Sequence, residues 1–237
     1  MALHRKYPAL MSLAPDLAII AECANPDILK GRSENSWIKS NAFWIGHNPN
    51  KGLAVFAFNG FQCDLAAEPD VNLRYVLPLR VRSPVSFNLL AVWAMHAASG
   101  DLPAQPAGPL PEAVIRYRDY LESSPTVIGG DLNNNVIWDK PRLPERSFKN
   151  ITDLLGKMGV RSCYHAVRPE IFGSETEPTL YWRDRKAEGP RYHIDYAFLP
   201  EEWLRYQPQI TIGKYDDWVG NGLSDHVPII VDIHFGR

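Results

Sequence analysis

Residues 127–133 of the chain read VIGGDLN: an apolar pair and two glycines, followed by an aspartate and an asparagine with one residue between them. The pattern predicts a buried strand that ends at Gly129 and Gly130, where the backbone can approach a ligand closely. Because side chains alternate along an extended backbone, we expect Asp131 and Asn133 to point the same way and to act on one phosphate or water. A turn formed by these residues is the alternative, since Asn and Asp are ordinary turn formers.

Outward from this segment, short strand patterns alternate with helical ones. Apolar, β-branched and aromatic runs predict strands over residues 17–21, 53–58, 73–81, 87–95, 126–128, 192–199 and 227–233. Helical spacing predicts helices over residues 7–13, 111–121 and 147–158. No proline- or glycine-rich segment is long enough to separate domains. We therefore expect one α/β domain over residues 1–237, with strands packed between helices.

The composition excludes several classes of protein. Hydrophobic residues make up 45% of the 237 residues and charged residues 22%, which excludes collagen-like, coiled-coil and wholly disordered chains. The formal net charge of −2 supplies no global field for attracting polyanions, so any nucleic-acid contact must be local. No apolar run suits a membrane-spanning helix or a secretory signal, so we expect no membrane contact and a cytoplasmic location. Cys23, Cys63 and Cys163 lack disulfide or zinc-site spacing and are expected to be buried thiols.

Two further polar segments lie near the C-terminus. Residues 224–228, SDHVP, place an acid and an imidazole before an apolar strand, and residues 192–196, YHIDY, contain another aspartate. Adjacent residues of a strand face opposite sides, so Asp225 need not be the partner that orients His226. The apolar neighbours of Asp195 are expected to share a buried face, which leaves Asp195 free to fix the tautomer and charge of the imidazole. Taken singly, each histidine is better explained as a satisfied structural residue or a surface residue.

Taken in order, five segments resemble the endonuclease/exonuclease/phosphatase superfamily, the metal-dependent phosphodiesterases with the DNase-I-like fold. The segments are residues 14–22 (APDLAIIAE), 51–55 (KGLAV), 130–133 (GDLN), 193–196 (HIDY) and 224–228 (SDHVP). Each is short, but their ordered combination is specific and covers nearly the whole chain. The resemblance implies a four-layer α-β-β-α sandwich of two mixed β-sheets, and hydrolysis of a phosphate ester by in-line attack of water.

The resemblance also implies metal-binding and water-activating residues. Glu22, at the end of its strand, would hold Mg²⁺ or Mn²⁺, and Asp225 would help to organise the metal site or a second ion. An exposed acid at a strand end is the alternative interpretation of Glu22. Asp131 would position or deprotonate the attacking water, and Asn133 would fix that aspartate or a phosphate oxygen.

The remaining catalytic residues face the scissile phosphate in this resemblance. Asp195 and His226 form a coupled pair, and His226 donates a hydrogen bond to the phosphate as negative charge develops. His96, after the strand over residues 87–95, would contact the phosphate or the leaving group, although a histidine at a strand end is often simply exposed. Ser224 lies in no G-x-S-x-G elbow and the chain has no phosphate-binding P-loop, so serine hydrolases and P-loop triphosphatases are excluded.

The predicted substrate is a phosphate ester, and basic segments near the expected site favour nucleic acid. Arg142, Trp138 and Trp182 are candidate substrate-binding residues that contact a phosphate backbone or stack on bases. A solvated charged face and the rim of the core explain them equally well. We predict a divalent-metal-dependent nuclease for DNA or RNA, with no obligate protein partner. The alternatives are a phosphomonoesterase or lipid-phosphate hydrolase of the same family, and a catalytically impaired binding module with the same fold.

The start of the sequence departs from the family pattern. Relatives open with a strand ending in an asparagine that reaches the metal site, whereas here Met1 stands almost directly before the first helix. We expect the natural start to lie upstream, because loss of an inner strand would leave unpaired backbone groups on its neighbours. The alternative is that the strand and its metal ligand are lost.

Overall fold

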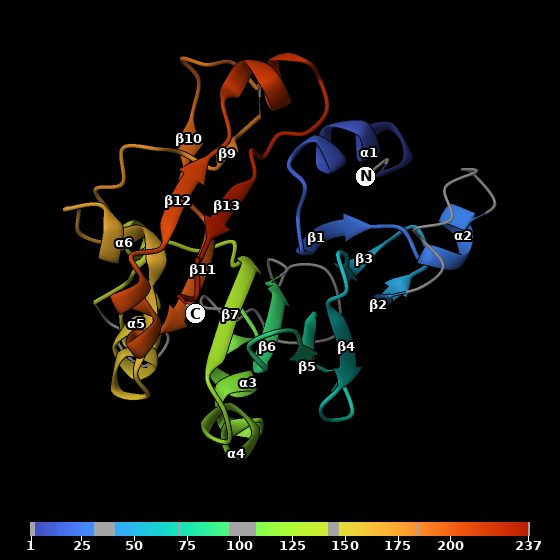
Figure 1. Ribbon diagram of the computed structural model, residues 1–237. Coiled ribbons are helices and arrows are strands. Elements are labelled where there is room, and N and C mark those ends of the chain that lie inside the picture. The colour runs from blue at the N-terminus through green and yellow to red at the C-terminus, as the bar shows by residue number, and fades with distance from the viewer. Residues whose placement is uncertain are drawn as a thin grey trace.

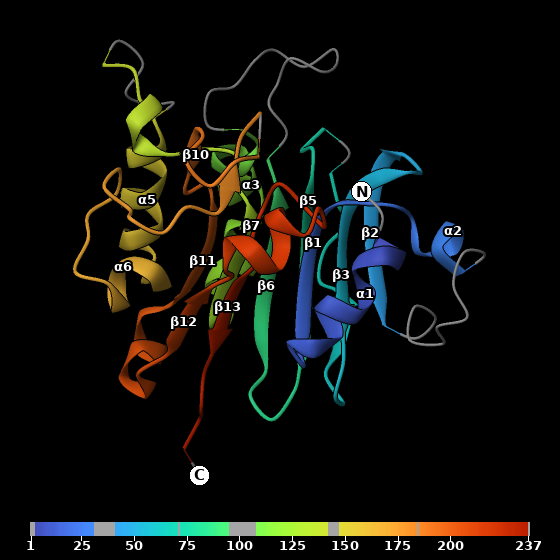
Figure 2. The same ribbon diagram turned by 90° about the horizontal axis from the view of Figure 1, so that it is seen from above.

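The computed structural model describes residues 3–30, 41–70, 72–94, 108–141, 147–183 and 185–236. The elements form four layers, with two strand layers inside and helices on both outer faces (Figure 1, Figure 2). The α/β sandwich expected from the sequence is confirmed. His96 and Arg142, two of the candidate site residues, lie outside the described ranges.

A six-stranded mixed sheet forms one inner layer. Its strands, in spatial order, are β4 (Gln62–Leu65), β5 (Val76–Arg82), β6 (Phe87–Trp93), β7 (Thr126–Asp131), β11 (Asp195–Pro200) and β8 (Val160–Ser162). β6 and β7 are parallel, and the other neighbouring pairs are antiparallel. Every residue of β6 is buried because the strand is covered on both faces, which explains its unbroken apolar sequence.

Three helices cover the outer face of this sheet: α3 (Leu110–Arg116), α4 (Arg118–Glu122) and α5 (Phe148–Lys157). Helix α5 begins where Ser147 caps it, with the serine hydroxyl accepting a hydrogen bond of 3.0 Å from the backbone N–H of Asn150. The single helix predicted over residues 111–121 is divided at Tyr117. There the backbone leaves helical geometry, and the tyrosine hydroxyl accepts a hydrogen bond from the backbone N–H of Asp70.

The second inner layer consists of two antiparallel sheets. One has the order β1 (Leu17–Cys23), β3 (Lys51–Ala57), β2 (Ala42–Asn48), and the other pairs β12 (Gln209–Ile212) with β13 (Ile229–Asp232). Leu53 and Val55 of β3 face the six-stranded sheet, and Val231 of β13 joins the same core. The sequence analysis predicted two mixed sheets. Among the described strands the six-stranded sheet is mixed, since β6 and β7 are parallel, whereas every strand pairing in the second layer is antiparallel.

Helices α1 (Leu3–Ser12) and α2 (Pro26–Lys30) lie on the outside of the second layer. Leu3 and Leu10, two turns apart, pack with Phe56 of β3. The helix therefore begins four residues before the predicted 7–13 segment and continues through Pro8.

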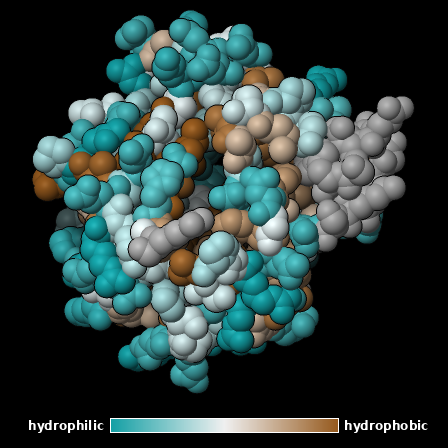
Figure 3. All heavy atoms as spheres, in the orientation of Figure 1, coloured by the Kyte–Doolittle hydropathy of each residue, from teal (hydrophilic) through white to brown (hydrophobic). Residues whose placement is uncertain are grey.

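A cavity of about 540 Å³ separates the two sheets of the second layer. β1 and β13 line it from opposite sides, residues of the six-stranded sheet and of α1 complete its lining, and no described strand lies between β1 and β13. Figure 3 shows this face of the molecule hollowed near its centre, where hydrophobic and hydrophilic residues meet.

The shorter elements were less predictable. The sequence analysis did not predict two groups of short elements. The first group is the strands β2, β4, β9 (Leu180–Tyr181) and β10 (Arg191–Tyr192). The second group is the helix α6 (Cys163–Val167) and the short helical turns η2 (Val136–Trp138), η4 (Glu201–Tyr206) and η5 (Asp216–Gly220). The strand predicted over residues 192–199 is divided into β10 and β11. The three cysteines are free and buried, as expected. In the described part of the chain, no helix has both the length and the apolarity that a membrane crossing requires.

Candidate active site

Asp131 is the last residue of β7 and is almost fully buried, at 6% exposure. Gly130 before it has a φ of +133°, and a Cβ at this position would overlap the backbone carbonyl of Val92 in the parallel neighbour β6. Glycine is required here because it alone combines this backbone conformation with such a close approach. The glycine pair in the sequence therefore fixes where Asp131 leaves the sheet.

Asn133 lies against Asp131 and is held in the left-handed region, with a φ of +47°. Its backbone N–H donates to Oδ1 of Asp131 at 2.9 Å, and its side-chain amide donates to Oδ2 at 3.0 Å. The turn considered in the sequence analysis is thus present, and within it Asn133 holds the carboxylate of Asp131 in a fixed orientation. Such strained positions are common where a side chain must be aimed.

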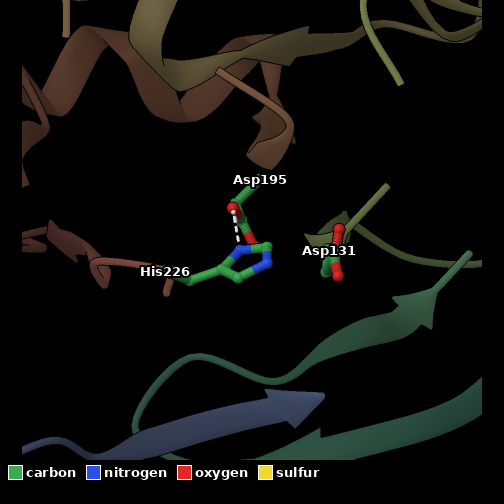
Figure 4. Close-up of side chains that lie close together, drawn as sticks. All are labelled: Asp131, Asp195 and His226. Atoms are coloured by element: carbon green, nitrogen blue, oxygen red, sulfur yellow. Dashed lines mark hydrogen bonds and ion pairs between the residues drawn. The ribbon is translucent and has the colours of Figure 1, made fainter. Parts of the chain in front are cut away.

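Asp195 and His226 complete a compact cluster with Asp131. Asp195, at the start of β11, lies directly opposite Asp131 across the β7–β11 pair. Oδ2 of Asp195 lies 2.9 Å from Nδ1 of His226 (Figure 4). One potential ligand atom from each of the three residues lies within 4.8 Å of the others, and the second ring nitrogen of His226 lies on the side of Asp131 (Figure 4).

Thr179, a fully buried residue, holds the segment that carries Asp195 against the segment that carries His226. Its hydroxyl oxygen accepts hydrogen bonds from the backbone N–H of Ile194 at 3.0 Å and of Asp195 at 3.1 Å. Its carbonyl accepts from the N–H of Val227, the residue after His226, at 2.9 Å. The sequence analysis missed Thr179, because a lone threonine before an apolar strand carries no signal for this double contact.

The charges of the cluster favour a cation. Burial, and then the negative charge of Asp195, raise the pKa of Asp131, and the positive charge of His226 opposes them. For His226, burial lowers the pKa, but the charge and hydrogen bond of Asp195, together with Asp131, outweigh burial and raise it. Two close carboxylates at a buried position are costly to ionise together unless positive charge is supplied.

Glu22 and Asp225 line the same cavity as the cluster, but each has another partner. Glu22 lies at an irregularity in the β1–β3 register with a φ of +55°, and its carboxylate is 2.8 Å from Nζ of Lys51. Asp225 is 3.3 Å from the guanidinium of Arg185. Among the described residues, the potential ligand atoms that lie close together belong to Asp131, Asp195 and His226, and to neither of these acids.

A second polar network lies beside the cluster and was also missed by the sequence analysis. The side-chain amide of Asn135 donates to the carbonyl of His193 at 3.0 Å and to Glu175 at 3.1 Å. Burial raises the pKa of Glu175, but hydrogen bonds from His165, Asn135 and the backbone outweigh it and lower the pKa to about 2. This network fixes the backbone that leads into Asp195.

The two candidate tryptophans lie at the surface, with Trp138 42% and Trp182 43% exposed. Trp138 ends η2, five residues after Asn133, and Trp182 follows β9. The edge of β9 reaches the site, because Leu180 forms an isolated antiparallel bridge with His226. Both tryptophans therefore belong to segments that also carry or contact site residues.

No family model matches the chain, and no curated protein matches it. Solved structures do match. The endonuclease domain of TRAS1, a telomere-specific non-LTR retrotransposon, has a TM-score of 0.60 at 14% identity over 100% of this chain and 94% of that one. Truncated TDP2 from Caenorhabditis elegans has a TM-score of 0.62 at 15% identity over 96% and 90%. The 3' phosphatase NExo from Neisseria has a TM-score of 0.64 at 15% identity over 98% and 96%.

These matches decide the fold. The chain has the endonuclease/exonuclease/phosphatase fold. At identities this low the likeness concerns the fold alone. Within this endonuclease/exonuclease/phosphatase fold, the cluster of Asp131, Asp195 and His226 lies where β7, β11 and the segment before β13 meet.

Proposed function

We propose that the chain is a divalent-metal-dependent phosphodiesterase that hydrolyses nucleic acid. The observation that carries the proposal is the convergence of potential ligand atoms of Asp131, Asp195 and His226 within 4.8 Å in the lining of a cavity. The structural neighbours support the substrate class, because one is an endonuclease domain and another, NExo, was solved bound to a product DNA hairpin.

The donor set suits a hard divalent cation. Carboxylate oxygens are the ligands that Mg²⁺ and Mn²⁺ prefer, and a cation beside Asp131 would oppose the burial and the negative charge that raise the pKa of this carboxyl. Asp131 and Asp195 would hold the ion, with Glu22 and Asp225 approaching from the same cavity. A bound ion supplies charge neutralisation at the phosphate and lowers the pKa of water.

The side chains around this position divide the remaining work. Asp131, held by two hydrogen bonds from Asn133, is positioned to orient or deprotonate a water. His226, kept protonated by Asp195, presents its Nε2–H as a fixed donor toward the charge that develops on a phosphate oxygen. No covalent intermediate is required, since water attacks in line with the leaving oxygen.

The proposal is tested by incubating the purified chain with Mg²⁺ or Mn²⁺ and with plasmid DNA, single-stranded DNA, RNA, and bis(4-nitrophenyl) phosphate. Chelator is expected to abolish hydrolysis. Asp131→Asn and His226→Gln are each expected to reduce kcat/KM by about 10²-fold or more. Glu122→Gln is the matched control, since this acid pairs with Arg118 on the surface of α4.

Each other outcome favours a different function. Release of phosphate from monoesters, without cleavage of diesters, would favour a phosphomonoesterase or lipid-phosphate hydrolase of the same fold. Binding of nucleic acid without hydrolysis of any substrate would favour a catalytically impaired binding module. Hydrolysis that survives both Asp131→Asn and His226→Gln would refute the assignment of the site.

A further inference from the structure

Two exposed tryptophans and a tyrosine form a continuous aromatic strip next to the cluster. The ring of Tyr192 lies between the two indoles, with centroids 5.0 Å from Trp138 and 6.2 Å from Trp182 and an interplanar angle of 61° in both contacts. The guanidinium of Arg183 lies over the Trp182 ring, 4.1 Å from its centroid. We call Trp138, Tyr192, Trp182 and Arg183 the aromatic strip.

The strip is built on fixed backbone. Trp138 ends η2, whose first turn is capped by the side chain of Asn135, a residue only 2% exposed. Tyr192 and Trp182 belong to the β9–β10 hairpin, where the N–H of Trp182 donates to the carbonyl of Pro190 at 2.8 Å. Little conformational freedom is therefore lost when a ligand stacks on these rings, which is the advantage of a preorganised aromatic surface.

The strip also adjoins the site at two points. Tyr192 precedes Asp195 by three residues, and its carbonyl accepts a hydrogen bond from the N–H of Thr179, which aligns Asp195. The N–H of Tyr181, next to Trp182, donates to the carbonyl of Asp225 at 2.8 Å. The segments that carry the strip are thus hydrogen-bonded to the segments that carry Asp195 and His226.

We propose that the aromatic strip binds unpaired bases of the substrate, so that the chain acts on single strands or frayed ends in preference to intact duplex. This inference rests on the proposed function and names the form of the nucleic acid. Open indole faces stack on any base, whereas the bases of a duplex are already stacked on one another. Among the large, exposed apolar side chains in the described ranges, Trp138 and Trp182 are the aromatic ones, and both belong to the strip.

The charge next to the strip suits a nucleic-acid strand. Arg183 stacks on Trp182 and forms an ion pair with no carboxylate of the described residues, which leaves its N–H groups available to a phosphate. Lys140, an exposed residue two positions after Trp138 in the chain, supplies a second cation to this segment. Bases on the rings and phosphates on these cations is the arrangement by which proteins bind single strands.

The test measures binding by anisotropy of fluorescein-labelled ten-nucleotide oligothymidylate, with a ten-base-pair blunt duplex as the competing form and chelator present to prevent cleavage. The intact protein is expected to bind the single strand more tightly. Trp138→Ala and Trp182→Ala are each expected to raise the Kd for the single strand by about 5-fold to 150-fold. Trp182→Phe, which retains an aromatic face, is expected to recover most of the affinity, and Arg183→Ala to reduce the dependence of binding on salt.

Ile115→Ala is the control, because this residue is 72% exposed on α3 and outside the strip. Urea midpoints of all variants separate loss of binding from loss of fold. Equal Kd values for the two tryptophan variants and the unchanged protein would overturn the proposal, as would tighter binding of the duplex. Hydrolysis of bis(4-nitrophenyl) phosphate by the unchanged protein tests the proposed function separately, so either idea can fail without the other.

Discussion

Replacing Thr179 by valine is expected to destabilise the protein far more than replacing it by serine. Valine keeps the shape of the side chain but removes the oxygen that accepts from both Ile194 and Asp195. Each buried N–H left without a partner costs about 1–3 kcal/mol, so the valine variant should lose about 2–6 kcal/mol. Serine keeps the acceptor and removes one buried methyl group, at a cost of about 1 kcal/mol.

Urea unfolding followed by tryptophan fluorescence measures this difference. With an m-value of about 3 kcal/mol per molar urea, Thr179→Val should lower the midpoint by about 0.7–2 M and Thr179→Ser by about 0.3 M. The order of the two variants is the critical result, because valine is the closer match in volume. If the valine variant is as stable as the serine variant, Thr179 does not hold Asp195 and His226 in register, and the reasoning is refuted.

Three other perturbations test the site and its support. Gly130→Ala should cost about 3 kcal/mol or more, from backbone strain and overlap with Val92, and a urea midpoint equal to that of the unchanged protein would contradict this. Because the pKa of Glu175 is lowered to about 2, ionised Glu175 stabilises the fold above about pH 5 by about 3 kcal/mol, and this contribution disappears as the pH falls from 5 to 2. The pH dependence of unfolding should therefore be flatter for Glu175→Gln over that range, and superimposable curves would refute the assignment. Saturating Mg²⁺, at about 100 times its Kd, should stabilise the unchanged protein by about 2.7 kcal/mol in thermal unfolding, and an equal gain for Asp131→Asn would exclude Asp131 as a ligand.

The parts of the fold that could be predicted from the sequence are those with simple periodicity. The unbroken apolar run of β6 and the helical spacing of α5 both mark elements whose buried faces are set by one geometry along their whole length. The VIGGDLN segment likewise predicted β7, although the strand continues through both glycines to Asp131 and does not end at them. Local sequence is sufficient where burial alone determines the element.

Elements whose ends depend on distant partners could not be predicted. The strand expected over residues 192–199 divides because β10 pairs with β9 whereas β11 pairs with β7, and at the break the hydroxyl of Thr179 accepts from the backbone N–H groups of Ile194 and Asp195. The helix expected over residues 111–121 divides at Tyr117, whose hydroxyl is held by the backbone of Asp70. Neither partner can be identified without the tertiary structure.

The candidate site shows the same limit. Alternation of side chains predicted that Asp195 faces away from its buried neighbours Ile194 and Tyr196. In the structure its Oδ2 lies 2.9 Å from Nδ1 of His226. The ion pair between Glu22 and Lys51 joins β1 to β3 and had no local signal. The roles of these residues stay predictions until the variants are measured.

The division of the second layer has a mechanical consequence. Glu22 is carried by the β1 sheet and His226 by the segment leading into β13, and among the described strands no backbone ladder joins the β1 sheet to the β12–β13 sheet. The distance between the two side chains therefore depends on how each of these sheets packs on the six-stranded sheet. A small shift of either sheet would change that distance without unfolding the protein. A ligand that contacts both Glu22 and His226 would therefore hold the two sheets at one separation.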